Sequence, residues 1–115
     1  MSETQLEVSI RVEGELAIID LQGEINAFAE AALINAYMDA SSTEAKSLAL
    51  DFTDVDYINS TGIALIVSLL AKARKDKQEV LAFGLTDHFQ NIFEITRLSD
   101  FMQIVPDEAA ALEKA

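Results

Sequence analysis

Residues 6–13 alternate between apolar and polar side chains, which is the period-two pattern of a β-strand with one wet face. The apolar positions are Leu6, Val8, Ile10 and Val12. Glu13-Gly14 predicts a turn, because glycine reaches positive φ without a steric cost. A second and more apolar run follows at residues 16–21. The pattern therefore predicts an antiparallel hairpin whose second strand is the more central of the two.

The apolar spacing changes to three- and four-residue steps after the segment Gly23-Glu24-Ile25-Asn26. This spacing predicts an amphipathic helix over residues 27–40, with Asn26 as its N-cap. The positions on its apolar side are Ala29, Leu33, Ala36, Tyr37 and Ala40. Residues 47–52 then form a short, mostly apolar run that suits a buried strand, with Asp51 at its carboxyl end.

Residues 63–73 are apolar nearly all round, so we expect a helix that is packed between other elements rather than half exposed. Ser60 is placed to be its N-cap, and the basic residues between Lys72 and Lys75 suit its carboxyl end. The remaining pattern predicts strands at 80–83 and 101–104 and helices at 87–98 and 107–114, the last of them following Pro106.

Strands and helices thus alternate after the hairpin, which is typical of a mostly parallel sheet with crossover helices. The predicted fold class is α/β: a mixed, mostly parallel sheet of about five strands that starts with the antiparallel hairpin, and about four helices. No repeat, linker or low-complexity tract interrupts the 115 residues. We expect residues 1–115 to form a single domain.

The composition narrows the classes of function. The chain has 20 acidic and 8 basic side chains, a net charge of −12 and no cysteine. Nucleic acid and anionic membranes are therefore disfavoured as partners, and disulfides, thiolate metal sites and thiol nucleophiles are excluded. The longest apolar run, residues 63–67, is far shorter than the ~20 residues of a transmembrane helix. The first residues lack the pattern of a signal peptide, so we expect a cytoplasmic protein.

The sequence predicts no catalytic machinery. The single histidine, His88, lies at the polar start of a predicted helix and has no second histidine with which to bind a metal. The glycines occur singly and form no phosphate-binding motif. Asp51, Asp54 and Asp56 could bind magnesium as in a receiver domain, or they could be solvated turn carboxylates, which is the interpretation we favour. We therefore expect no catalytic residue, no metal and no cofactor.

The segment from Asp56 to Gly62 joins a predicted strand to the most apolar helix of the chain. Ser60 lies at the start of this helix, where the first backbone N–H groups have no intrahelical partner. One interpretation is that Ser60 and Thr61 only cap the helix. The other is that Ser60 is a modification site, because a phosphoryl group at a helix N-terminus meets unpaired N–H donors and the positive end of the helix dipole.

Three segments of the chain resemble the STAS domain family (sulfate transporter and anti-sigma antagonist), and in particular its free-standing bacterial anti-anti-sigma factors. These segments are Gly23 to Asn26, Asp54 to Ile63, and Ile92 to Leu98, the last of which is similar to a stretch of the family's third helix. The resemblance covers essentially the whole chain, and it implies the STAS fold.

In that family an anti-sigma factor, which is a serine kinase of the histidine-kinase-like ATPase fold, phosphorylates its antagonist. The resemblance implies that Ser60 is the phosphoacceptor. The unphosphorylated form would bind the kinase and release the sigma factor, phosphorylation would block binding, and a PP2C-type phosphatase would reverse it. The resemblance also implies a switch loop and a partner-binding surface formed by Asp56, Asn59, Thr61, Gly62, Glu24, Asn26, Ala27 and Phe28. The alternative is a constitutive STAS scaffold without phosphoryl switching.

Three positions depart from the family pattern. Asn59 stands where Asp commonly precedes the acceptor serine, and Asn26 stands where Asp commonly follows the Gly-Glu-(Leu/Ile) motif. Both replacements remove a carboxylate near the expected phosphate and so lower the repulsion of that phosphate. Arg97 replaces the usual glycine before Leu98, so we expect the end of that helix to close differently.

Overall fold

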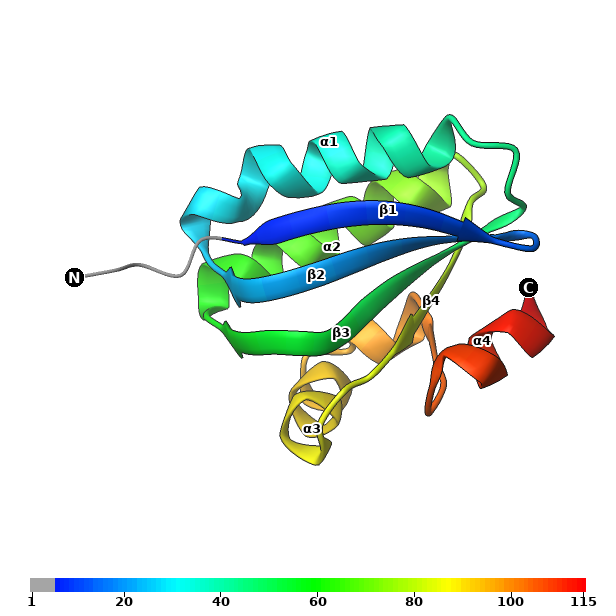
Figure 1. Ribbon diagram of the computed structural model, residues 1–115. Helices are drawn as coiled ribbons and strands as arrows, with labels where there is room; N and C mark the ends of the chain where they lie inside the picture. Colours follow the sequence, from blue (N-terminus) through cyan, green and yellow to red (C-terminus); the bar gives the residue numbers. More distant parts are fainter. Residues whose placement is uncertain (1–5) are drawn as a thin grey trace.

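The strands lie in one sheet in the order in which they occur along the chain, β1-β2-β3-β4-β5 (Figure 1). The structure, a computed structural model, describes residues 6–115. The strands are β1 (Glu7–Glu13), β2 (Leu16–Ile25), β3 (Ser47–Ile58), β4 (Glu79–Phe83) and β5 (Gln103–Ile104). β1 and β2 are antiparallel, and each later strand is parallel to the one before it. The expected α/β class is therefore confirmed, including the hairpin and the mostly parallel sheet.

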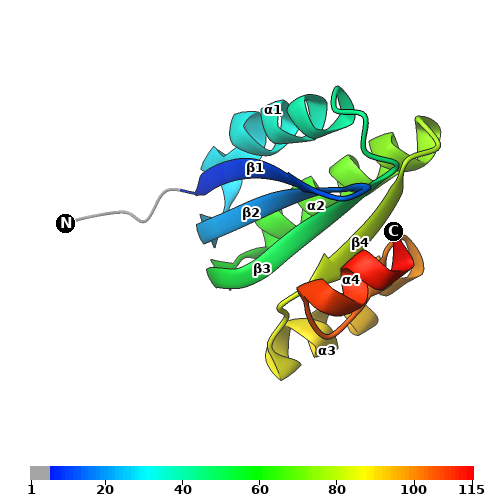
Figure 2. The same cartoon turned by 45° about the vertical axis from the view of Figure 1, so that its right-hand side comes forward.

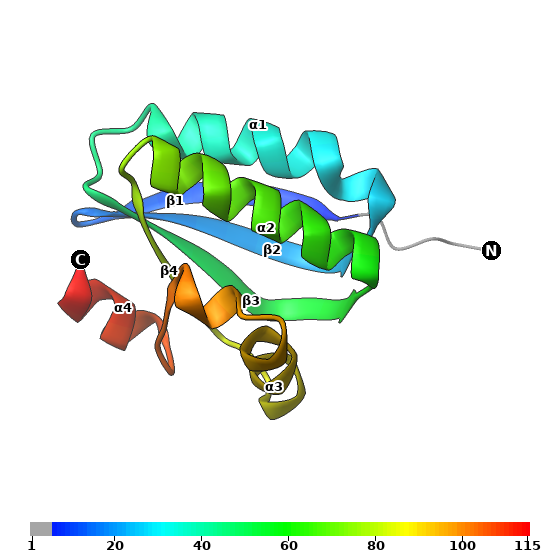
Figure 3. The same cartoon turned by 180° about the vertical axis from the view of Figure 1, so that it is seen from behind.

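Helices cover both faces of this sheet. They are α1 (Glu30–Ser41), α2 (Ser60–Lys75), α3 (Asp87–Ile95) and α4 (Glu108–Lys114), with two 3₁₀ helices, η1 (Ala27–Ala29) and η2 (Leu98–Asp100). α1 and α2 lie side by side on one face (Figure 3), whereas α4 lies on the other face, close to β4 (Figure 2). Two predicted helices had the wrong extent: the one at 27–40 begins as the 3₁₀ helix η1, and the one at 87–98 ends at Ile95.

The main core lies between the sheet and helices α1, α2 and α3. Every apolar position that the spacing predicted for the first helix is buried, from Ala29 to Ala40. Phe52 of β3 and Phe93 of α3 meet edge to face, with ring centroids 5.4 Å apart. A second, smaller cluster of buried apolar side chains lies on the opposite face of the sheet, beneath α4. The fold thus has two apolar layers, of which the one under α1 to α3 is much the larger.

β2 and β3 both extend beyond the predicted runs of 16–21 and 47–52. They remain paired as far as Ile25 and Ile58, through two register shifts. These shifts and the polar side chains on the wet face break the apolar alternation, so the pattern could not indicate the extension. As a result Asp51, Asp54 and Asp56 lie within β3 and not in a turn after it.

Helix α2 is not sandwiched, and this expectation was wrong. Ile66, Leu69 and Leu70 face the core, but Val67 is 41% exposed. Within the described part of the chain no further layer covers the outer side of this helix. The helix is therefore more apolar than its burial in the fold requires.

A membrane-spanning helix would have to be longer and more apolar than any helix found between residues 6 and 115.

Candidate functional site

The carboxyl ends of β2 and β3 meet the starts of η1 and α2 at one end of the sheet (left in Figure 1). The backbone N–H of Asn59 donates to the carbonyl oxygen of Ile25 over 3.2 Å. Gly62 lies against the same carbonyl group, since a Cβ atom on Gly62 would be 2.0 Å from the Ile25 oxygen. Only glycine fits there without a shift of the backbone. This contact brings together the two sequence segments that carry the candidate site residues.

The N-cap of α2 is Asn59 and not Ser60, which corrects the sequence prediction. Asn59 has an extended backbone (φ −92°, ψ −179°), and its Oδ1 accepts from the Gly62 N–H at 2.8 Å. Its carbonyl oxygen accepts from the Ile63 N–H at 2.9 Å. Ser60 is displaced by one position because β3 runs on to Ile58 and asparagine is a strong N-cap type. Ser60 is therefore the first helical residue, and its side chain is exposed.

Asn26 caps the neighbouring 3₁₀ helix in the same way. Its Oδ1 accepts from the Phe28 N–H at 2.9 Å, and its Nδ2 donates to Glu24 Oε1 at 3.3 Å. The cap holds the turn in which Ala27 is exposed and the Phe28 side chain is 85% exposed. Both asparagines that depart from the family pattern are thus caps. An amide oxygen makes the hydrogen bond that a carboxylate would make, so the cap is kept and the charge is removed.

The surface around Ser60 combines acidic and apolar side chains. Asp54, Asp56 and Thr61 are exposed, and Glu24 is half-buried. Tyr57, which pairs in register with Glu24 on the neighbouring strand, is 54% exposed. Tyr57 was not singled out in the sequence, because β3 was expected to end before it. Such a surface suits a protein partner better than a small polar ligand.

The first two N–H groups of α2 belong to Ser60 and Thr61, and they precede the capped N–H of Gly62. Helix geometry gives them no intrahelical acceptor. A phosphoryl group on the Ser60 oxygen would lie beside these donors and at the positive end of the helix dipole. The position can therefore hold a phosphate locally.

The magnesium cluster, which was the disfavoured interpretation of Asp51, Asp54 and Asp56, is not assembled in the described residues. Asp54 and Asp56 are exposed, whereas Asp51 accepts hydrogen bonds from Thr53 and lies 3.8 Å from Arg11. Residues 6–115 contain no group of three acidic or histidine side chains arranged to hold a metal ion. His88 is exposed in the first turn of α3, whose N-cap is Thr86.

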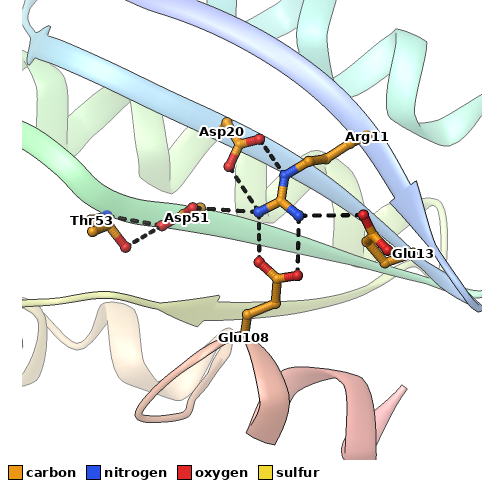
Figure 4. Close-up of polar contacts among 6 residues, drawn as sticks. All are labelled: Arg11, Glu13, Asp20, Asp51, Thr53 and Glu108. Carbon is orange, nitrogen blue, oxygen red and sulfur yellow. Dashed lines mark hydrogen bonds and ion pairs between the residues drawn. The ribbon is translucent and has the colours of Figure 1, made fainter.

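A cluster that was not predicted from the sequence surrounds Arg11 on the face of the sheet that carries α4 (Figure 4). Arg11 Nε lies 2.6 Å from Asp20 Oδ2, and its two terminal nitrogens bond both Glu108 oxygens at 3.0 and 2.6 Å. The side chain of Glu13 lies farther out, at 3.6 Å. The alternation placed Arg11 on the wet face of its strand, but Glu108 lies 97 residues away and no pattern could pair it with Arg11.

The carboxylates of this cluster have different acidities. The hydrogen bonds from Arg11 hold the pKa of Glu108 below its usual range. Burial is the largest single influence on the pKa of Asp20 and would raise it, but the hydrogen bonds with Arg11 and Asp51 and the positive charge of Arg11 together lower that pKa. Burial raises the pKa of Asp51, and the neighbouring Asp20 adds to this effect. Arg11 in turn is held firmly in its charged form, with a raised pKa, by Glu108 and Asp20.

Arg97, two residues after the last residue of α3, has a left-handed backbone conformation. Arg97 has φ 68°, a value that glycine adopts without steric cost. The helix end therefore closes as a glycine would allow, and the expected difference in closure is not seen. Arg97 Nε also bonds Asp100 at 2.8 Å.

Comparison with known proteins gives consistent matches. Residues 7–111 match the STAS domain family. The anti-sigma-B factor antagonist of Listeria monocytogenes is 35% identical over 86 residues, which cover 75% of each chain. The crystal structure of an anti-sigma factor antagonist from Mycobacterium paratuberculosis has a TM-score of 0.80 at 16% identity, over 96% of this chain and 93% of that one. The phosphorylated form of the Bacillus cell fate determinant SpoIIAA has a TM-score of 0.64 at 15% identity, over 96% and 98%.

Proposed function

Because the chain belongs to the STAS domain family, we propose that it is an anti-sigma factor antagonist whose binding is switched by phosphorylation of Ser60. The unphosphorylated form binds an anti-sigma factor that is also a serine kinase, and so releases the sigma factor. Phosphorylated Ser60 blocks this binding, and a PP2C-type phosphatase reverses the modification. The observation that carries the proposal is the exposed position of Ser60 as the first residue of α2, between acidic and apolar side chains.

The geometry supports a switch that acts by charge and not by refolding. A phosphate adds a charge of about −1.5 to −2 at neutral pH. The N–H groups of Ser60 and Thr61 can hold it in place, so α2 remains helical. Asp54 and Asp56 already make this surface negative, and a phosphate that meets the apolar part of the partner surface would have to give up its hydration, which opposes binding. The relatives support the proposal too: one is named an anti-sigma-B factor antagonist, and the SpoIIAA structure is of a phosphorylated form.

The exposed aromatic side chains indicate how the partner is held. Phe28 is 85% exposed and Tyr57 is 54% exposed, and large apolar side chains of this kind are common anchors of protein interfaces. Glu24, Asp54 and Asp56 add carboxylates around them. The partner surface that fits is an apolar pocket bordered by basic side chains, which would also speed the encounter by electrostatic steering.

The test combines modification and binding with the candidate kinase. Incubation with the kinase and ATP, followed by peptide mass spectrometry, should find one phosphate, on Ser60. Ser60→Ala should bind the kinase like the wild type, and Ser60→Asp should bind at least about tenfold more weakly. Ser68→Asp is the matched control, because it adds the same charge at an exposed position of the same helix.

Two outcomes would count against the switch. Phosphate on Thr61 alone would remove the acceptor assignment. Equal affinity of Ser60→Ala and Ser60→Asp would favour the alternative of a constitutive STAS scaffold, in which Ser60 is only part of the helix start.

A further inference from the structure

Helix α4 is attached to the rest of the fold by small side chains. It is the last helix of the chain and lies alone on its face of the sheet (Figure 2). Ala111 is its fully buried residue, Ala110 and Ala115 are partly buried, and Leu112 remains 38% exposed. Contacts through alanine methyl groups bury little apolar area per residue. The packing of α4 is therefore weak compared with that of α1 or α2.

The side chains beneath α4 form a cluster of their own. Leu16, Ile18, Ala49, Leu81 and Phe83 point to this face of the sheet and are at most 3% exposed. They pack with Val105 and Ala111, and none of them belongs to the main core. Since α4 contributes no residue to the main core, its departure would uncover this apolar cluster and leave the other layer intact.

One ion pair fastens α4 to the sheet. The two terminal nitrogens of Arg11 bond both oxygens of Glu108, in the first turn of α4, at 3.0 and 2.6 Å (Figure 4). The same guanidinium is held from the sheet side by Asp20. Among the residues that the structure describes, this is the only ion pair between α4 and another element. Arg11 therefore acts as a clasp between β1 and the carboxyl-terminal helix.

We propose that α4 is a detachable cover, which opens from the sheet as a unit while the rest of the fold persists, and that the Arg11–Glu108 clasp sets how often it opens. A helix of seven residues is far below the ~12–15 at which an isolated helix becomes marginal in water, so the released segment loses its helical structure. Opening uncovers Leu16, Ile18 and Phe83, an apolar patch on the face opposite to α1 and α2. The proposal is independent of Ser60 and of the function proposed above.

Native-state amide hydrogen exchange of the full chain tests the cover. The amide of Ala111 donates to the N-cap residue Asp107, and the amide of the C-cap residue Ala115 donates to Ala111. Both amides should exchange at least about tenfold faster than those of Ile19 and Leu50 in the central strands. Glu108→Gln should speed the α4 amides by a further factor of about three, and the strand amides by no more than that factor, because the ion pair stabilises the closed form against both the open and the unfolded forms. Glu113→Gln, which removes the same charge at an exposed position of the same helix, should change neither set.

Three results would overturn the proposal. α4 amides that exchange at the rate of Ile19 in the wild type would show that the helix opens only when the whole protein unfolds. α4 amides that exchange at the wild-type rate in Glu108→Gln would show that the ion pair does not hold α4 closed. Equal effects of Glu108→Gln and Glu113→Gln would show that Arg11 is not the clasp.

Discussion

Gly62 lies in direct contact with the backbone of Ile25, so that a Cβ atom at position 62 would be 2.0 Å from the Ile25 carbonyl oxygen and 2.7 Å from its carbonyl carbon. The start of α2 is thereby held against the end of β2, and Ser60 is held beside the turn that carries Phe28. This contact joins two of the segments that resemble the STAS family, Gly23 to Asn26 and Asp54 to Ile63.

We expect Gly62→Ala to lower the free energy of unfolding by about 1–3 kcal/mol, because the added methyl group meets backbone atoms that cannot rotate away. Urea denaturation followed by circular dichroism measures the change. Thr61→Ala, at the exposed neighbouring position, should stay within about 0.5 kcal/mol of the wild type. An equally stable Gly62→Ala protein would show that the end of β2 moves aside at no cost.

The cap at Asn59 predicts opposite results for two substitutions. Asn59→Ala removes the acceptor of the Gly62 N–H and should lower the free energy of unfolding by about 1 kcal/mol. Asn59→Asp keeps the acceptor and adds a charge that the helix dipole favours, so it should gain about 0.3–1 kcal/mol at low salt. Thermal denaturation of both variants checks this. Similar losses in both variants would mean that the amide group has a role other than capping.

Phe28 should contribute to affinity and not to stability, because its side chain is 85% exposed. If the proposed function holds, Phe28→Ala should weaken binding of the anti-sigma factor by about tenfold or more at unchanged melting temperature. Val12→Ala is the control: Val12 is 50% exposed but lies next to the hairpin turn, at the opposite end of the sheet. Calorimetric titration that finds the same affinity for Phe28→Ala and wild type would remove Phe28 from the interface.

The left-handed backbone of Arg97 predicts that a glycine at this position stabilises the folded protein. Arg97→Gly removes a conformational cost of about 1–2 kcal/mol and loses an exposed ion pair with Asp100, which contributes about 0–1 kcal/mol. Arg97→Ala loses the same ion pair and keeps the cost. The glycine variant should therefore be the more stable of the two by about 1 kcal/mol in urea denaturation. The reverse order would mean that Arg97 is not left-handed in solution.

The cluster around Arg11 predicts two opposite pH dependences. Burial raises the pKa of Asp51 in the folded state, so its ionised form opposes folding. Asp51→Asn should therefore raise the free energy of unfolding by up to about 1 kcal/mol at pH 7. This gain should fade as the pH falls, first through the pKa of Asp51 in the folded state and then through its lower pKa in the unfolded state. The hydrogen bonds from Arg11 lower the pKa of Glu108. Glu108→Gln should lower the free energy of unfolding by about 0.5–1 kcal/mol at pH 7. This loss should fade as the pH falls through the lowered pKa of Glu108 in the folded state.

Denaturant titrations between pH 3 and pH 7 measure both profiles. Glu113→Gln is the control, because Glu113 is exposed, and its profile should follow the wild type. A stability loss in Asp51→Asn at pH 7 would mean that the attraction of Arg11, 3.8 Å away, outweighs the burial of Asp51.

The local spacing of apolar and polar residues was sufficient to predict most of the helices and strands. The alternation at residues 6–13, the three- and four-residue spacing at 27–40 and the order of strands and helices predicted the hairpin, the buried face of α1 and the α/β class. The likeness of three segments to a known family also indicated where to look for a switch. These features depend on residues that are close together along the chain, so they can be predicted from the sequence alone.

The cap of α2 shows where local reasoning failed. Ser60 and Asn59 are both good N-cap types, and the choice between them depends on where β3 ends. Pairing with β2 carries β3 on to Ile58, and Asn59 then becomes the first residue free to cap. The strand partner that decides this lies more than thirty residues away, at Ile25.

The sequence by itself determined the class of fold, the buried side of the first helix and an acidic composition that disfavours nucleic acid as a partner. Only the tertiary structure decided that Gly62 rests on Ile25, that Val67 faces outward, and that Arg11 binds Glu108. The physical reason is that periodicity records which face of an element is apolar, whereas contacts between distant segments depend on how those faces are packed in three dimensions.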